Sequence, residues 1–479
     1  MSDKKSEAFK EVASWKIDAK LEDNERYFYK TFEVDMLLKG EKSYVIGRKG
    51  TGKTAIANFL RSKVSYDYFA RSISLKHFPF NDLYPLKDNS YTNPNEYITI
   101  WKYIIYMNIL HLMQKNESLD IRIRKDIEAI LPNKPIRGLS RRVKSTTSRE
   151  FKFDIKALSF SHGSSDIEDK LNWIEKVDLL EELIFENIDN SNYFIIFDEL
   201  DEDYKYQSVV EPTGQYLNLI AGLFKAVQYI KSLSFEYSLK INPVIFLRDD
   251  IYDLIQDHDK TKWSDLAIFL TWTKYTIQPL IAYRLSKAKY LHHDVESFER
   301  IWNYFFSGDE IYFGGNRDKQ ISIYDWITKE TLQRPRDYIK YIQLCAKKAY
   351  ESNHPKIFSG TVTTQDITYS SYFRSELVDE IHSILPDIEK VLDMFSKIGK
   401  AYLNIEEFRE LYELNYSEGR LVNKDYKFIL QVLFNFSVIG NHNNDTNKLV
   451  FRYINKEANL NFDHAITLHR GLYKSLQLY

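Results

Sequence analysis

The sequence has 479 residues, which is more than one ordinary domain and fits two or three. Apolar residues make up 44%, enough for hydrophobic cores, and the formal net charge of −2 gives no global electrostatic case for nucleic-acid binding. The single cysteine, Cys345, excludes an intrachain disulfide and cannot make a cysteine zinc site alone. The polar N-terminus and the lack of an apolar run that could span a bilayer lead us to expect a cytoplasmic protein with no membrane partner.

The first part of the chain follows a helix–strand–loop–helix pattern. Residues 1–40 are predicted to be polar and helical, and residues 43–46 form a short β-prone run. A glycine-rich loop at 47–54 separates this run from a helix predicted at 55–63. A second strand is predicted at 71–75.

The next stretch is mostly helical and holds an insertion. Residues 92–132 are predicted to be helical, and the alternation of apolar and polar residues at 151–162 predicts an exposed hairpin strand. A further helix is predicted at 167–188. About 140 residues separate Thr54 from Asp198, so most of 85–175 is interpreted as inserted.

Three more strands are predicted after this insertion. Residues 193–197 form a continuous apolar run typical of a buried parallel strand, and residues 243–247 form another. Residues 275–278 are predicted to be the last strand. Strands that alternate with helices predict a parallel α/β core, which we expect to span residues 1–280.

Strand signals fade after residue 280. Residues 281–383 are predicted to form a helical lid subdomain, and residues 384–479 a compact tail. In the tail, three helices and then a hairpin predict a winged-helix-like domain, with the helices near 388–398, 405–414 and 425–436 and the hairpin strands at 437–439 and 449–453.

The loop at 47–54 carries the strongest chemical signal. It matches G-x-x-x-x-G-K-[ST] between a strand and a helix, the context in which this motif binds phosphates. Glycines let backbone N–H groups face a phosphate, and the helix directs its N-terminal dipole at the anion. Lys53 is expected to reach the β- and γ-phosphates of ATP, and the Thr54 hydroxyl to bind Mg²⁺. The predicted nucleotide-binding residues are Gly47, Arg48, Lys49, Gly50, Thr51, Gly52, Lys53 and Thr54.

An acidic pair ends the apolar run at 193–197. Asp198 is expected to help hold Mg²⁺, and Glu199 to orient and deprotonate the attacking water. A solvated acidic strand end is the alternative for this pair. For Asp201 and the acidic residues at 202–203 a solvated loop is the favoured interpretation.

Two arginine signals follow. Arg248 comes directly after the strand at 243–247, at the edge of the sheet where ligands of parallel α/β proteins bind. Its alternative role is an ion pair with Asp249 or Asp250. Arg334-Pro335-Arg336 precedes a predicted helix, and an arginine there could reach the nucleotide, with a basic surface turn as the alternative.

These motifs together resemble AAA+/STAND ATPases related to replication initiators. The phrases Ile-Gly-Arg-Lys-Gly-Thr-Gly-Lys-Thr and Phe-Leu-Arg-Asp-Asp-Ile look more closely like a poorly characterised bacterial P-loop ATPase family found among mobile and defence-associated genes. The resemblance implies ATP hydrolysis with Mg²⁺, catalysed through Lys53, Glu199, Arg248 as sensor 1 and Arg336, or Arg334, as sensor 2. It implies a P-loop NTPase (AAA+-like) parallel sheet core, a helical lid and a C-terminal winged-helix-like domain. An oligomer is possible, but we find no arginine finger that would reach a neighbouring subunit, so assembly into a ring stays an open question.

Two classes of load are considered for this ATPase, where the load is the molecule on which ATP hydrolysis acts. The first is duplex DNA or another nucleic acid, which is indicated by the tail and by a basic stretch beside the predicted hairpin. The alternative for the basic stretch is a solvated loop. The alternative for the tail is a protein-interaction module. The basic residues are Arg137, Arg141, Arg142, Lys144 and Arg149. The second is a STAND-like nucleotide-gated module that controls a partner effector protein.

Overall fold

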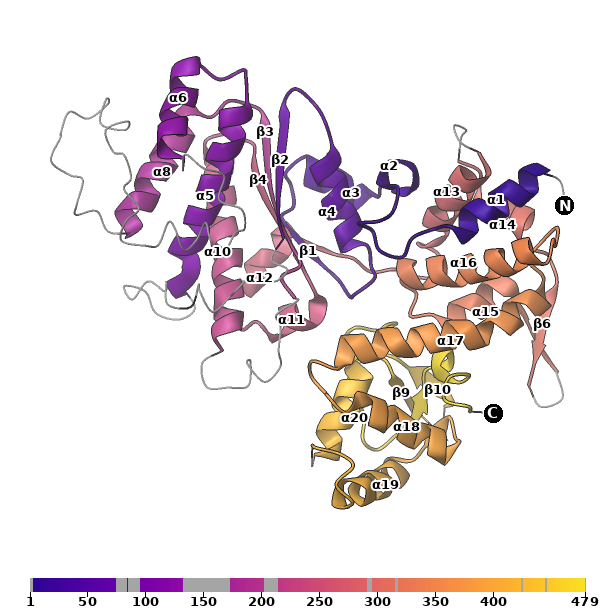
Figure 1. The fold of residues 1–479 in the computed structure, drawn as a ribbon. Coiled ribbons are helices and arrows are strands. Elements are labelled where there is room, and N and C mark those ends of the chain that lie inside the picture. The colour runs from indigo at the N-terminus through magenta and orange to yellow at the C-terminus, as the bar shows by residue number, and fades with distance from the viewer. Residues whose placement is uncertain are drawn as a thin grey trace. The chain divides into compact units, whose positions relative to one another are not determined.

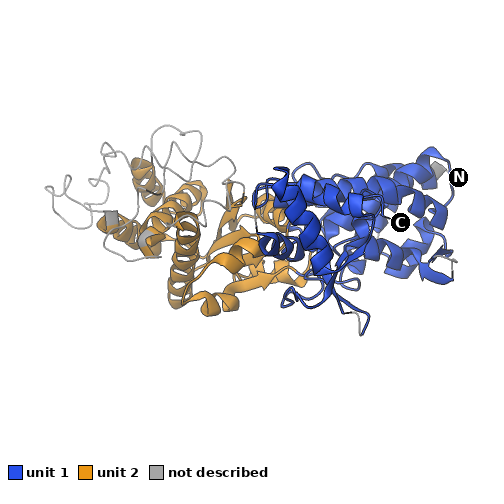
Figure 2. Ribbon diagram, turned by 90° about the horizontal axis from the view of Figure 1, so that it is seen from below, with its two compact units in different colours: residues 1–29, 49–52, 271–479 blue, residues 30–48, 53–270 orange. Residues whose placement is uncertain are grey.

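The computed structural model describes residues 3–74, 84, 95–131, 173–201, 214–290, 295–314, 318–423, 425–443 and 446–478. The chain divides into two compact units, which Figure 2 colours separately. Unit 1 comprises Met1–Tyr29, Lys49–Gly52 and Thr271–Tyr479, and unit 2 comprises Lys30–Arg48 and Lys53–Leu270.

Unit 2 is built on a parallel sheet of five strands. Their spatial order is β2-β3-β4-β1-β5, and every neighbouring pair is parallel. The buried apolar runs predicted from the sequence form the centre of this sheet, as expected for strands covered on both faces. The strands are β1 Tyr44–Ile46, β2 Tyr68–Ser74, β3 Asn192–Asp198, β4 Ile241–Leu247 and β5 Ala267–Phe269.

Helices cover both faces of this sheet (Figure 1). One face is covered by α4 (Lys53–Ser62) and the other by α5 (Ile98–Lys115) and α10 (Gln215–Glu236). Trp101 on α5 is fully buried and donates its indole N–H to the carbonyl of Leu219 on α10, at 2.8 Å. The other α-helices among the described residues of the unit are α3 Phe32–Leu38, α6 Ile121–Ile130, α8 Trp173–Asn187, α11 Asp249–Leu254 and α12 Lys260–Trp263.

The predicted α/β P-loop fold is confirmed, but one predicted strand is wrong. Residues 275–278 do not form the last strand, because they lead into α13 (Gln278–Lys289), whose first turn contains proline. The fifth strand is instead β5, at Ala267–Phe269, which pairs with β1. Three residues are too few to show an alternating pattern, so this strand was not predicted from the sequence. The hairpin predicted at 151–162 lies outside the described residues.

Unit 1 combines the N-terminal helices with the lid region. The N-terminal helix α1 (Asp3–Ala13) places Phe9 and Val12 in the core of this unit, where the Phe9 and Phe305 rings meet edge to face with centroids 5.4 Å apart. The remaining described helices before residue 382 are α2 Asn24–Tyr27, α13 Gln278–Lys289, α14 Phe298–Phe305, α15 Ile323–Glu330, α16 Pro335–Glu351 and α17 Ser359–Ile381. A hairpin of β6 (Glu310–Phe313) and β7 (Lys319–Ser322) interrupts the region that we expected to be a helical lid.

The tail of unit 1 contains its predicted elements in the predicted order. Three helices precede an antiparallel hairpin: α18 Ile388–Ile398, α19 Ile405–Ser417, α20 Tyr426–Asn435, β9 Ile439–Asn443 and β10 Lys448–Val450. Two strands were not predicted, β8 (Tyr402–Leu403) and β11 (Ala465–Leu468), and they complete a sheet in the order β10-β9-β11-β8. The tail and the lid helices share one hydrophobic core.

Candidate nucleotide site

The backbone of the loop at 47–54 requires glycine at two positions. Gly50 has φ of +84° and Gly52 has φ of +105°, a region that glycine adopts without steric cost. A Cβ on Gly50 would also lie 3.1 Å from the Cβ of Arg336. Helix α4 begins at Lys53, within the motif at 47–54, so its N-terminal N–H groups face the loop and are suited to bind an anion.

Lys53 lies folded against its own loop. Its Nζ donates hydrogen bonds to the carbonyls of Gly47, at 2.7 Å, and Arg48, at 3.0 Å. Burial lowers the pKa of Lys53, and the nearby carboxylates of Asp201 and Asp249 oppose that shift. The nearby carboxylates thus favour the charged ammonium form of Lys53, which is the form that binds phosphate.

Three consecutive carbonyls of the loop accept hydrogen bonds within unit 1. Arg334 Nη1 donates to the carbonyl of Lys49 at 3.0 Å, the N–H of Arg336 to that of Gly50 at 3.3 Å, and Trp272 Nε1 to that of Thr51 at 3.0 Å. In a trans peptide the C=O and the next N–H point in opposite directions. The N–H groups of residues 50–52 therefore point away from these donors.

The acidic pair lies where the sequence analysis expected it, at the end of β3. Asp198 is only 8% exposed, and burial raises the pKa of its carboxyl to about 6. Glu199 has φ of +63°, a left-handed conformation uncommon outside glycine. Its carboxylate accepts a hydrogen bond from Ser74 Oγ, at the end of the neighbouring strand β2.

Sequence reasoning missed Ser74. A hydroxyl at the end of a predicted strand is a signal only when the neighbouring strand and its register are known. Here Ser74 pairs with Asp198, which lies 124 positions further along the chain (198 − 74). The order of the strands places a donor beside Glu199 that no local pattern reveals.

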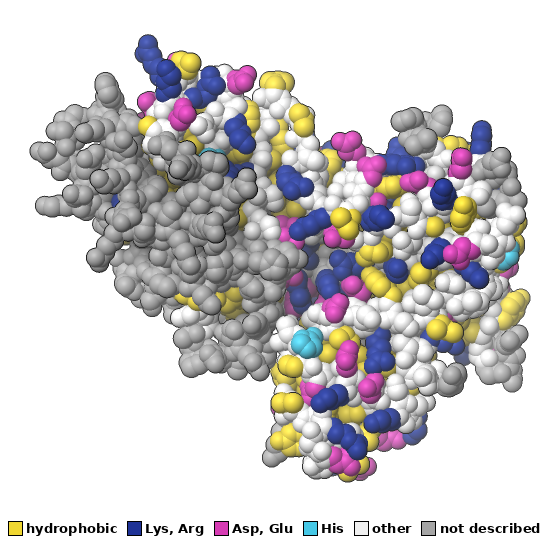
Figure 3. All heavy atoms as spheres, viewed as in Figure 1, with side chains coloured by type: hydrophobic (Ala, Val, Ile, Leu, Met, Phe, Trp, Pro, Cys, Tyr) yellow, Lys and Arg dark blue, Asp and Glu magenta, His cyan; other side chains and the backbone are white. Residues whose placement is uncertain are grey.

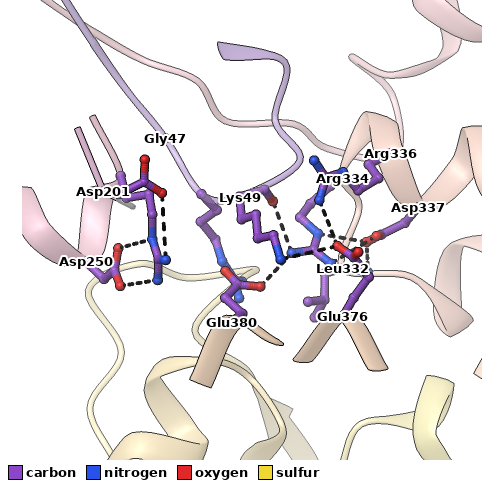
Figure 4. Close-up of polar contacts among 12 residues, drawn as sticks. Gly47, Lys49, Asp201, Asp250, Leu332, Arg334, Arg336, Asp337, Glu376 and Glu380 are labelled. Atoms are coloured by element: carbon purple, nitrogen blue, oxygen red, sulfur yellow. Dashed lines mark hydrogen bonds and ion pairs between the residues drawn. The ribbon is translucent and has the colours of Figure 1, made fainter. Parts of the chain in front are cut away.

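Arg248 follows β4, the strand that lies between β3 and β1. Its Nε and Nη2 donate to the two carboxylate oxygens of Asp250, at 2.9 and 2.6 Å, so the ion pair considered as its alternative role is present. Its Nη1 is also 3.8 Å from a carboxylate oxygen of Asp201 (Figure 4). We expected Asp201 to lie in a solvated loop, and that expectation did not include Arg248 as its neighbour. Residues 202–203 lie outside the described residues.

The two arginines around Pro335 have different surroundings (Figure 4). Arg334 is 2% exposed and donates to both carboxylate oxygens of Asp337 at 3.0 Å and to Glu380 at 3.1 Å, besides Lys49. It therefore does not lie in a surface turn. Arg336 is partly exposed, and its Nη1 is 2.7 Å from a carboxylate oxygen of Glu376.

The predicted nucleic-acid residues lie outside the described part of the chain. These are Arg137, Arg141, Arg142, Lys144 and Arg149. On the described surface drawn in Figure 3, Lys and Arg side chains are interspersed with Asp and Glu. Of the described helices, none is long and apolar enough to cross a membrane. Nor do three or more His, Cys, Asp or Glu side chains gather to hold a metal ion among the residues that the structure describes.

One family model matches the chain. The FunZ-associated C-terminal helical domain matches residues 277–378, which cover α13 to most of α17. This match includes Arg334, Arg336 and Glu376 but spans well under half of the sequence. A search of curated proteins gives no match.

Solved structures give distant resemblances. Cdc6p from Pyrobaculum aerophilum is 12% identical, with a TM-score of 0.34 over 98% of this chain and 96% of that chain. The ORC2 protein of Aeropyrum pernix, solved as ADPNP–ADP complexes, is also 12% identical, with a TM-score of 0.40 over 93% and 90%. Drosophila ORC bound to DNA is 12% identical, with a TM-score of 0.30 over 99% and 92%. At these TM-scores function is inferred from the site residues alone.

Proposed function

We propose that this protein is an ATP-binding and ATP-hydrolysing molecular switch that uses Mg²⁺. The observation that carries this function is the gathering of opposite charges at one edge of the unit 2 sheet. Lys53 follows β1, Arg248 follows β4 and Asp198 ends β3, and these three strands are adjacent. The carboxyl ends of adjacent parallel strands share one edge, which is where such sheets bind ligands.

The residues at this edge fit a nucleotide. The loop N–H groups and the N-terminus of α4 provide donors for phosphate oxygens, and Lys53 provides a cation. On binding, Lys53 would exchange its hydrogen bonds to the Gly47 and Arg48 carbonyls for phosphate oxygens. Mg²⁺, when bound, would neutralise negative charge on the phosphates.

Thr54 and Asp198 are the residues that we assign to Mg²⁺. Such ions are commonly held by one or two protein groups together with phosphate oxygens and water, so a cage made wholly of protein side chains is not required. The carboxyl of Asp198 must be ionised to bind the metal, and its raised pKa, about 6, leaves it ionised at neutral pH.

Glu199 is the residue that we assign to water activation. Its carboxylate follows Asp198 on the chain, and the hydrogen bond from Ser74 holds it in one orientation. A positioned carboxylate can accept the proton of an attacking water, a contribution of about 10²- to 10⁴-fold in rate. Arg248 is the candidate that responds to the terminal phosphate, provided that its pair with Asp250 opens.

Calorimetry and phosphate release test this function with three variants. Lys53→Ala is expected to lose ATP binding, whereas Glu199→Gln is expected to keep it and to turn over at least about 10²-fold more slowly. Arg61→Ala, an exposed basic residue on the same helix as Lys53, is the matched control and should behave as the wild type. Wild-type ATP affinity in Lys53→Ala would show that the loop does not bind the nucleotide.

As the load of this switch we propose duplex DNA, in a bacterial defence or mobile-element context. The basic stretch at 137–149 and the order of elements in the tail support DNA, and the resemblance named above supports the context. Phosphate contacts from the basic residues would make the interaction weaken as salt rises. The alternative load is a partner effector protein that responds to the nucleotide state.

ATP turnover with and without duplex DNA separates these loads. DNA that raises turnover at low salt, with the effect lost in Arg141→Ala/Arg142→Ala and at high salt, supports DNA as the load. An unchanged rate at every salt concentration would reject DNA and leave the effector protein. Lys63→Ala, which changes an exposed basic residue elsewhere, controls for the loss of positive charge.

A further inference from the structure

We propose that Glu376 competes with the terminal phosphate of the bound nucleotide for Arg336 and Lys49, and thereby sets how strongly the site prefers ATP to ADP. This regulation rests on the ATP binding proposed above. One carboxylate oxygen of Glu376, on α17, is 2.7 Å from Arg336 Nη1 and 3.8 Å from Lys49 Nζ. Lys49 belongs to the phosphate-binding motif itself, so both cations meet this carboxylate beside the loop (Figure 4).

The backbone of Arg336 is fixed at the loop, whereas its charged end is not. The Arg336 N–H donates to the Gly50 carbonyl at 3.3 Å, and a Cβ on Gly50 would lie 3.1 Å from that of Arg336. Three rotatable side-chain bonds beyond Cβ separate the guanidinium group from this fixed point, and the group donates a hydrogen bond to Glu376. Rotation about these bonds can therefore redirect the charge without moving the start of α16.

The neighbouring Arg334, by contrast, forms ion pairs that are buried and cannot readily be exchanged. Glu380 follows Glu376 by one turn of α17 and pairs with Arg334, and both side chains are almost completely buried. Arg334 also donates to both oxygens of Asp337 and to the carbonyl of Lys49. Removing Arg334 from these partners would leave buried carboxylates unpaired, so it serves as a positioning residue of the loop.

The pair of Arg336 and Glu376 can be exchanged. The side chains of Arg336, Lys49 and Glu376 are 24%, 28% and 16% exposed, and water weakens ion pairs of this kind. Arg336 and Lys49 share one carboxylate oxygen of Glu376. A terminal phosphate carries more charge than a carboxylate and offers bidentate acceptors to a guanidinium group. It can thus displace Glu376, whereas ADP lacks that group.

Nucleotide affinity of Glu376→Gln tests this competition. We expect the variant to bind ATP about 2- to 5-fold more tightly than the wild type, the range of a partly exposed ion pair, with little change for ADP. In Arg336→Met/Glu376→Gln the gain for ATP should shrink to the part that Lys49 contributes. Asp393→Asn is the matched control, because it breaks the ion pair with Arg374 at the surface of the same helix and should leave both affinities unchanged.

The outcomes separate this inference from the function on which it rests. A wild-type protein that binds no ATP rejects the nucleotide site as a whole. If the wild type binds ATP but Glu376→Gln binds it equally or less tightly, Glu376 only joins α16 to α17 and the competition is rejected. Should Glu376→Gln fail to fold, Glu376→Asp replaces it, since the shorter carboxylate withdraws from both cations and predicts the same direction.

Discussion

At the scale of single residues, the buried carboxylate of Asp198 lowers the stability of the fold but is proposed to bind Mg²⁺. Burial raises the pKa of its carboxyl from 3.8 to about 6, so between these values the folded state holds a proton that the unfolded state releases. Stability therefore falls as the pH rises through this window, and the full cost remains above it. A carboxylate kept in the sheet at this cost fits a residue retained for a ligand.

Asp198→Asn is accordingly expected to stabilise the protein in the absence of nucleotide. The gain should be about 2–3 kcal/mol at pH 7.5 and shrink to about 1 kcal/mol at pH 4.5, because the wild-type carboxyl is then largely protonated when folded. Urea unfolding at the two pH values measures it. Asp265→Asn, at an exposed carboxylate of the same unit, should change stability little at either pH. A gain that is equal at both pH values would contradict the assignment.

Residues that sequence reasoning found differ from those it missed in how local their signals are. Lys53, Asp198 and Arg248 each follow a recognisable strand, so neighbouring residues are enough to mark them. Ser74 and Glu376 act through partners 125 and 40 positions away. Their roles depend on strand register and on the pairing of two helices, which no local pattern contains.

At the scale of elements, the predictions succeeded where patterns were long. The apolar runs of β3 and β4 and the tail helix α18 were placed to within one or two residues. The strand β5 and the hairpin of β6 and β7 have three or four residues per strand, too few for a period to show. Short elements acquire their conformation from their neighbours, and those neighbours become known only with the fold.

Helix α1 shows that an element predicted as merely polar can complete a core. Phe9→Ala is expected to destabilise unit 1 by about 3–5 kcal/mol, because it removes a completely buried ring that packs against Phe305. Lys10→Ala, at the next and exposed position of the same helix, should change stability by less than about 0.5 kcal/mol. Urea unfolding followed by tryptophan fluorescence compares the two. Equal effects would mean that α1 does not contribute to the core.

At the scale of the whole molecule, the order of the chain does not follow the division into units. Residues 1–29 belong to the same compact unit as residues 271–479, and four residues of the phosphate-binding loop belong to it as well. The donors to the loop carbonyls at 49–51 are Trp272, Arg334 and Arg336, all of which come after residue 270. Nucleotide binding is therefore expected to depend on parts of the chain far from the motif.

A chain limited to residues 30–270 tests this dependence. It retains the parallel sheet and the complete loop, so we expect it to fold, but it lacks the three donors that direct the loop N–H groups. Each neutral hydrogen bond stabilises the loop conformation by about 1 kcal/mol, and a hydrogen bond from a charged group stabilises it somewhat more. Because the loop must adopt this conformation to bind the phosphates, ATP affinity should fall by at least about 10-fold. Calorimetry measures the affinity, and circular dichroism checks the folding, with full-length Lys53→Ala as the reference for lost binding. A folded fragment that binds ATP as tightly as the full chain would show that residues 30–270 shape the loop by themselves.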